Sequence, residues 1–288
     1  MKRLGTLALG LVGLVLIAAV WEIYKALGPE KGVLVGGRAI LPRTSDRAMP
    51  HVWEMVTRLG GPAVGRTGDP LWLKVLDACG FSLRIAAVGL LIGLVVGLGL
   101  ALVMQRVRLL ESAILPWIVL SQTVPLIAIA PLVRRWGSEI TVGSFEWSSE
   151  NSVAVIAAYL AFFPVAVGML RGLKAPDQTH LDLMRTYGTG WWATLVRLRL
   201  PASVPYLLPA VRLAAASAVI GTVVAEVSIG LRGGIGRLII EYAQSAGGDA
   251  AKPWAPIFGA IAIGLIAAGF VGLVGLLLRP YRRSEAPA

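Results

Sequence analysis

The chain has 288 residues, of which 56% are hydrophobic and 15% are charged. An ordinary soluble domain carries roughly 25% charged residues, so the composition excludes a disordered chain or a collagen and argues against a water-soluble enzyme. The net charge of +11 comes without a basic run interleaved with aromatic residues, which indicates cationic flanks of membrane helices and no nucleic-acid partner. Cys79 is the only cysteine, and His51 and His180 lie far apart, so we expect no disulfide, metal site or cofactor.

Six apolar runs are long enough to be membrane helices, because about 20 apolar residues cross the hydrocarbon core. They lie at residues 4–21, 85–105, 112–133, 151–170, 206–225 and 253–278. The first run also fits a cleaved signal peptide, but no A-x-A cleavage site precedes Trp21, so we expect a retained helix. The fifth run contains Arg212 one or two turns inside the helix, where an arginine can extend to the interface.

Lysine and arginine fall mainly on one side of this arrangement. Lys2 and Arg3 precede the first run, and the tail after the sixth run carries Arg279, Arg282 and Arg283. The loops after the second and fourth runs hold Arg106, Arg108, Arg171, Lys174, Arg185, Arg197 and Arg199. Since cytoplasmic loops are enriched in these residues, both termini are expected in the cytoplasm.

The long connection at residues 28–80 is expected on the opposite, extracytoplasmic side. It is rich in glycine and proline, and its apolar patterns at 49–59 and 71–78 predict short amphipathic helices along the membrane face. A polar stretch at 143–151 is expected on the same side.

Small residues and prolines within the runs predict how the helices pack. Gly89, Gly93 and Gly97 are spaced four apart, which allows a neighbouring helix to approach closely, and packing within the chain is the favoured interpretation. Three prolines within the third run predict a kinked or broken helix, which membranes tolerate where protein or a cavity satisfies the freed carbonyls. They are Pro116, Pro125 and Pro131.

The stretch from 171 to 205 has its own predicted structure on the cytoplasmic side. Asp177 can cap a helix over 178–187, and Gly188 supplies its stop. A second helix is expected from 190 to 199, ended by Pro201. This helix–glycine–helix elbow fits a surface loop and a docking site for a cytoplasmic partner equally well.

The elbow resembles the EAA motif of the permease subunits of binding-protein-dependent ABC importers. That motif reads E-A-A, three residues, G, nine residues, I, one residue, L-P. Gly188, Leu200 and Pro201 match it outright. Asp182 replaces the glutamate and Leu198 the isoleucine, while Leu183 and Met184 replace two alanines, so the docking surface is expected to be shaped differently.

The resemblance extends over nearly the whole chain. It is carried by Trp21-Glu22, Leu41-Pro42 with Ser45, Ser82-Leu83-Arg84, Gln122 to Leu132 with Trp136-Gly137, and Val224-Ala225-Glu226 with Gly234-Ile235-Gly236. These segments are similar to the nitrate, sulfonate, taurine and pyrimidine-precursor branch of the family.

The resemblance implies an all-α polytopic permease with six transmembrane helices and a cytoplasmic coupling-helix elbow. Its parts are an N-terminal helix at 1–27, the outer segment 28–80, a core of five helices at 81–283 with the EAA-type loop at 171–203, and a tail at 284–288. The implied setting is a homodimer in the plasma membrane of a prokaryote, with a cytoplasmic ATPase and an extracytoplasmic solute-binding protein. No G-x-x-x-x-G-K-[ST] motif occurs, so ATP hydrolysis must come from another subunit.

The resemblance assigns the ATPase contact to a set of elbow residues. They are Asp182, Leu183, Met184, Arg185, Gly188, Leu198, Leu200 and Pro201. Candidate pathway or gating residues are Gln122, Pro125 and Pro131 at the broken third span, and Glu226. An intramembrane carboxylate is a functional-site hypothesis by default, while the other interpretation of Glu226 is a hydrated or arginine-paired interface residue.

Two other functional classes of membrane protein are not excluded by the sequence. A secondary transporter would need ion-coupling residues inside the membrane and an inverted repeat. An integral-membrane enzyme would need convergent polar residues, and the sequence offers no catalytic motif such as H-E-x-x-H or G-x-S-x-G. The solute is left open among sulfonate, taurine, nitrate, and pyrimidine- or riboflavin-like compounds.

Overall fold

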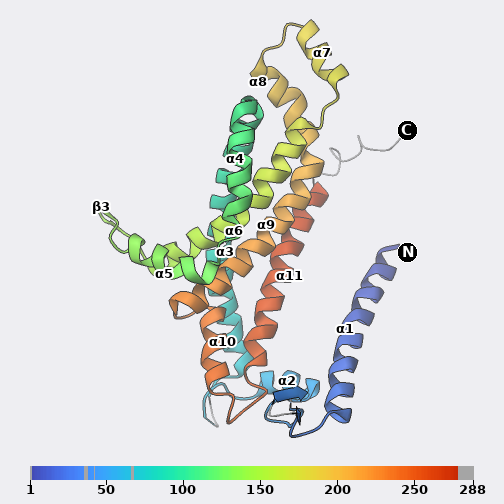
Figure 1. Cartoon of the computed structure of the whole chain (residues 1–288), viewed down its shortest axis with the longest axis vertical. Helices are drawn as coiled ribbons and strands as arrows, with labels where there is room; N and C mark the ends of the chain where they lie inside the picture. Colours follow the sequence, from blue (N-terminus) through green and yellow to red (C-terminus); the bar gives the residue numbers. More distant parts are fainter. Residues whose placement is uncertain (1, 36–37, 42, 66–67, 278–288) are drawn as a thin grey trace. The chain divides into compact units, whose positions relative to one another are not determined.

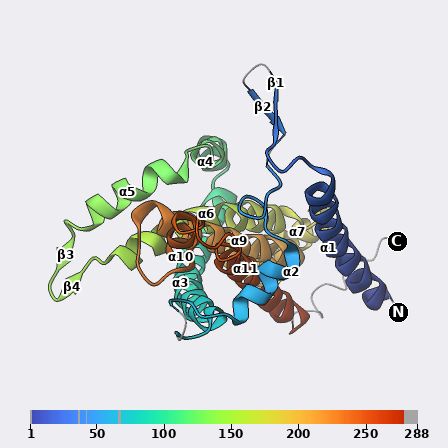
Figure 2. The same cartoon turned by 90° about the horizontal axis from the view of Figure 1, so that it is seen from below.

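The computed structural model describes residues 2–35, 38–41, 43–65 and 68–277. The chain divides into two units, which are residues 1–77 with 238–259 and residues 78–237 with 260–288. Figures 1 and 2 show the elements of both units in two views. The predicted tail at 284–288, the arginines after residue 278 and Pro42 lie outside the described residues.

The first unit contains the N-terminal helix and a compact cap. It comprises α1 (Lys2–Leu27), the antiparallel hairpin β1 (Val33–Val35) and β2 (Arg38–Leu41), α2 (Val52–Thr57) and the 3₁₀ turn η1 (Arg58–Gly60). The helix predicted at 49–59 is thus confirmed as α2 with η1, while the hairpin was not predicted.

The second unit is a helical bundle. It holds most of α3 (Leu71–Arg106) and the whole of α4 (Arg108–Ser121), α5 (Leu126–Gly137), the hairpin β3 (Thr141–Val142) and β4 (Phe145–Glu146), α6 (Ser149–Lys174), α7 (Gln178–Thr186), α8 (Trp191–Thr194), the π-helical turn η2 (Leu195–Arg199) and α9 (Leu200–Ile229). Helices α10 (Ile235–Gln244) and α11 (Trp254–Leu277) each pass from one unit to the other.

The prediction of a separate short helix at 71–78 is wrong. Residues 71–78 are the first turns of α3, which continues without a break into the second predicted span. A glycine such as Gly80 costs only about 1 kcal/mol in a helix interior. That cost is small beside the burial of Leu71, Val75 and Ala78 on one face of the helix.

Helix α6 is the centre of the bundle, with fourteen buried residues. The glycine stripe of α3 packs against it: a Cβ added at Gly89 would lie 2.5 Å from the Ala157 Cβ, and one at Gly93 would lie 2.7 Å from the Ala161 Cβ. From the other side, a Cβ on Gly221 of α9 would lie 3.0 Å from the Ala157 Cα. The predicted close approach within the chain is therefore confirmed.

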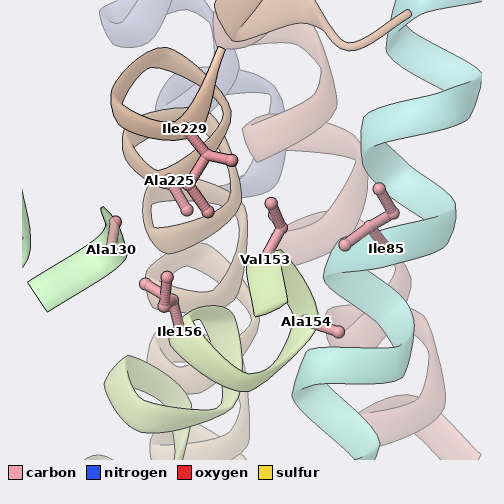
Figure 3. Packing of buried hydrophobic residues seen from close by; sticks show 7 residues of the cluster. All are labelled: Ile85, Ala130, Val153, Ala154, Ile156, Ala225 and Ile229. Atoms are coloured by element: carbon pink, nitrogen blue, oxygen red, sulfur yellow. The ribbon is translucent and has the colours of Figure 1, made fainter. Parts of the chain in front are cut away.

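One end of this core is a cluster shared by four helices. Ile85 of α3, Ala130 of α5, a group on α6, and Ala225 and Ile229 of α9 are all buried there (Figure 3). The α6 members are Val153, Ala154 and Ile156. Through Ala130, the cluster anchors the first half of α5 to the bundle.

Four helical segments among the described residues are long and apolar enough to cross a membrane: α3, α6, the continuous helix Trp191–Ile229 and α11. The pair α4 and α5 makes a fifth if it is counted as one broken span, since the two helices meet at 102°. The predicted break in the third span is thus confirmed. Figures 1 and 2 show α5 leaving the bundle and ending in the β3–β4 hairpin.

Candidate functional site

The elbow lies at one end of the second unit, where α7 follows α6 (Figure 1). No residue of α7 is buried, so the helix is open to a partner. Asp177 is its N-terminal flanking residue as predicted, although its side chain makes no capping hydrogen bond.

Gly188 ends α7 with φ of +65°, a conformation that residues with a Cβ rarely adopt. The Gly188 N–H donates to the Arg185 carbonyl at 2.8 Å, and the Thr189 N–H donates to the Met184 carbonyl at 3.0 Å. These two bonds are the pair that defines a Schellman motif. The predicted glycine stop is therefore confirmed, and it fixes the direction in which the chain leaves α7.

The outer face of the elbow combines a charged pair with exposed apolar side chains. Arg185 donates to Asp182 at 2.9 Å, and both side chains are more than 60% exposed, so the pair contributes little stability. Leu183 is 52% exposed and Tyr187 is 74% exposed. Sequence reasoning missed Tyr187, whose signal would have been its place directly before the glycine stop.

The second helix of the predicted elbow does not end at Pro201. It continues from Trp191 to Ile229, and Pro201 lies near the start of α9. The π-helical turn immediately before it explains this difference, because the Leu200 N–H donates to the Leu195 carbonyl, one residue farther back than in an α-helix. The wider turn accommodates a proline that has no N–H to donate.

Two contacts hold the base of the elbow on the bundle. Arg199 donates through Nη1 to the Leu173 carbonyl at the end of α6, at 2.9 Å. The Arg106 guanidinium at the end of α3 lies 4.9 Å from the centre of the Trp191 ring. Of the predicted coupling residues, Leu198, Leu200 and Pro201 therefore belong to this base, while Asp182 to Arg185 belong to the exposed helix α7.

The break between α4 and α5 contains Gln122 and Pro125. Its freed carbonyls are satisfied inside the chain, since Tyr159 of α6 donates to the Ser121 carbonyl and the Thr123 hydroxyl donates to the Leu120 carbonyl at 2.8 Å. The Gln122 amide donates to the Ser121 hydroxyl at 3.2 Å. Pro125 begins α5 without a side-chain cap, and Pro131 is exposed on the same helix. The break is therefore stabilised by hydrogen bonds within the bundle.

Glu226 is completely buried and connects three helices. Its carboxylate accepts hydrogen bonds from the Ser82 hydroxyl of α3 at 2.7 Å and from the Gly236 N–H of α10 at 2.8 Å. The Ser82 hydroxyl accepts in turn from the Ile235 N–H at 2.9 Å. A carboxylate at the start of α10 is favoured by the helix dipole. A Cβ on Gly234 would overlap the Glu226 carboxylate, which explains the glycine at that position.

The cap in the first unit is held by charged hydrogen bonds. The buried Lys25 amine donates to Asp46 and to the Met49 carbonyl, both at 2.6 Å. The hydrogen bond and the charge of Lys25 lower the pKa of Asp46 below its usual value. Trp21 packs edge-on against Trp254 at 5.1 Å between ring centroids, and Arg58 binds Asp249 at 2.5 Å. The cap therefore ties the end of α1 to residues that follow α10.

Two comparisons with known proteins give the same family. A family model described as the inner membrane component of binding-protein-dependent transport systems matches residues 89–283. The formylaminopyrimidine transport permease protein ThiX of Halalkalibacterium halodurans is 31% identical over 208 residues, which cover 71% of this chain and 77% of ThiX. The nitrate import permease protein NrtB of Synechococcus elongatus is 26% identical over 269 residues, covering 93% and 84% of the two chains.

A chain in the crystal structure of an amino acid ABC transporter with histidines has a similar fold. The TM-score is 0.55 at 17% sequence identity, and the match covers 73% of this chain and 94% of that chain.

Proposed function

The chain belongs to the family of inner membrane components of binding-protein-dependent transport systems, and on this premise we propose that two copies form the translocation pathway of an ABC importer. As a permease of this family the chain is not itself catalytic, and the transport system implies an ATPase and a solute-binding protein. Family membership sets aside the secondary transporter and the membrane enzyme.

The proposed topology has six spans with both termini in the cytoplasm. Helix α1 supplies the first span and the bent pair α4–α5 the third, in addition to the four long helices. The distribution of lysine and arginine supports this orientation. We retain the segments 1–27, 28–80, 81–283 and 284–288 as functional parts, although α3 crosses the 80/81 boundary as one continuous helix.

The elbow is the proposed contact with the ATPase. The observation that carries this proposal is an exposed helix, α7, at the position of the EAA motif, with its direction fixed by the Schellman motif at Gly188. Because α8, η2 and α9 form one continuous helix, a force on the elbow would reach the membrane core directly. ATP-driven approach of two elbows would then rock the spans between inward- and outward-open states.

The pathway is proposed to pass the break at Gln122 and Pro125, with Pro131 on the arm beyond it. An uncapped helix start at membrane depth can present backbone N–H groups to an anionic or polar solute. Glu226 is proposed as a gating residue rather than a pathway-lining one, since its carboxylate is fully engaged by α3 and α10.

The proposed solute is a small organic or anionic compound delivered by the binding protein. The named solutes of the relatives are formylaminopyrimidine for ThiX and nitrate for NrtB. The higher identity to ThiX supports a pyrimidine-type compound ahead of a riboflavin-like compound, a sulfonate, taurine or nitrate.

The test is purification from native membranes in mild detergent, with the partners identified by mass spectrometry. We expect an ATPase and a binding protein in the eluate, and ATP hydrolysis that rises when the loaded binding protein is added. Gly188→Val should remove the ATPase, because a β-branched residue is strained at positive φ. Gly190→Val is the matched control, since Gly190 is also exposed and has φ of −72°. Solute uptake by the chain without any ATPase would contradict the proposal.

A further inference from the structure

Arg212 is a charged residue inside an apolar helix. It lies within the candidate span Trp191–Ile229, its side chain is exposed, and within the described part of the chain it has no hydrogen bond or ion pair. An arginine near the centre of a membrane helix is unfavourable unless its guanidinium reaches the interface or finds an anion. No described residue supplies such an anion, so a neutralising group is expected from beyond the described residues.

The guanidinium lies in the crevice between α9 and α11. Its Nη2 would be 3.2 Å from a Cβ placed on Gly272, and Leu208 packs over Gly275 one turn farther along α11. Helical side chains lean toward the N-terminus of their helix, which for α9 is the end that carries the elbow. Arg212 thus extends toward the membrane surface on the elbow side.

An apolar groove of about 360 Å³ begins beside this guanidinium. It runs between α3, α9 and α11, and every lining residue is alanine, valine, leucine, isoleucine or phenylalanine. Ala215 lines it one turn after Arg212, and Val271 lines it directly before Gly272. The groove and the arginine therefore form one surface that is charged at one end and apolar along its length.

We propose that this surface binds an anionic phospholipid from the leaflet on the elbow side. The phosphate pairs with Arg212, and an acyl chain occupies the groove. Basic residues beside crevices between membrane helices are suited to lipid phosphates, because the headgroup neutralises the charge while the tail covers apolar surface. The proposal requires only that the chain is inserted in a membrane, so it stands apart from the proposed solute and coupling mechanism.

The carboxylates on α3, α4, α6 and α9 do not suit this position, which favours a lipid over one of these helices from a second copy. Glu226 is buried at the other end of α9, and Glu111, on the elbow side, is paired with Lys174. Asp77 and Glu150 lie near the helix ends remote from the elbow. A lipid phosphate is the anion that the membrane itself supplies at the required depth.

The experiment is native mass spectrometry of the purified full chain titrated with phosphatidylglycerol or with phosphatidylcholine. We expect tighter binding of phosphatidylglycerol, and a loss of roughly five-fold or more in Arg212→Gln, the effect of about one basic residue at an anionic surface. Arg212→Lys should retain most of the binding. Ala87→Phe should reduce it by filling the groove from an exposed lining position.

Arg135→Gln is the matched control, because it removes an exposed arginine from α5, away from the groove. Only variants whose unfolding temperature equals that of the wild type are compared, so that a folding defect is not mistaken for lost binding. Equal binding of phosphatidylglycerol to the wild type and to Arg212→Gln overturns the proposal. A disulfide between Ala87→Cys and a cysteine on a helix of a second copy also overturns it, since a helix would then occupy the groove.

Discussion

The contact between α3 and α6 and the elbow at α7 are held in place by opposite means. The first contact depends on the glycines, because the α6 alanines lie so close to Gly89 and Gly93 that a Cβ added at either position would clash with them. Helix α7 of the elbow has no buried residue, and its direction depends on the backbone bonds of the Schellman motif at Gly188. A substitution in the core should therefore alter stability. A substitution at the elbow should instead alter the binding of a partner.

The largest loss of stability is expected from one added methyl group in the core. Gly93→Ala would place a Cβ 2.7 Å from the Ala161 Cβ, and overpacking of this kind costs typically 1–3 kcal/mol. Gly99→Ala is the matched control on the same helix, because nothing lies within 4 Å of its Cβ position. Thermal unfolding in detergent should show a lower midpoint for the first variant and an unchanged or higher one for the second. Equal midpoints would mean that the α3–α6 contact is looser than described.

A loss of similar size is expected at the carboxylate that links α3, α9 and α10. Glu226→Ala leaves the Ser82 hydroxyl and the Gly236 N–H buried without their acceptor, a cost of about 1–3 kcal/mol. Glu226→Gln keeps one acceptor oxygen and should lose less. Glu150→Gln, at a 40% exposed side chain, serves as the control in the same unfolding assay. Normal stability with abolished transport in Glu226→Ala would favour a pathway role instead.

Removal of the π-helical turn should lower stability only slightly but impair the coupling of the elbow to ATP hydrolysis. Deleting Val196, which is 57% exposed, would convert the turn to α-helix and rotate α8 by about 100° relative to α9. The Arg106–Trp191 contact would be lost, at a cost of about 1 kcal/mol. We expect the complex to assemble but ATP hydrolysis to lose its response to the loaded binding protein. A full response in the deletion variant would show that the orientation of the elbow does not matter.

The smallest effect is expected at the exposed pair on the elbow. Arg185→Ala removes the partner of Asp182, and an exposed pair at this spacing contributes no more than about 1 kcal/mol. The unfolding midpoint should stay within error of the wild type. Any loss of ATPase binding in pull-down would then report on the docking surface itself, and a large fall in stability would contradict the exposed position of α7.

The sequence predicted what depends on local pattern. Apolar runs located the long helices, Gly188 located the end of α7, and the glycine spacing on α3 predicted a close neighbour, although not that it is α6. The prolines predicted the break near Pro125, but the angle of 102° depends on partners such as Tyr159, which is 38 residues from Ser121.

Features that depend on distant contacts were missed. The partners of Glu226 could not be predicted, because Ser82 lies 144 residues away in the sequence. Pro201 was predicted to end a helix, since local rules do not anticipate a π-helical turn that accommodates it. Leu71 was placed on a separate helix because the stretch at 71–78 is amphipathic, a pattern that does not reveal continuity with α3.

Site-specific cross-linking tests the coupling role of the elbow most directly. A photo-reactive residue in place of Leu183, on the exposed face of α7, should form a covalent adduct with the ATPase in native membranes. The same residue in place of Ile127, which is 63% exposed on α5, is the control and should form none. An adduct at position 183 alone is the predicted result. No adduct at position 183, or equal adducts at both positions, would contradict the assignment of α7 as the ATPase contact.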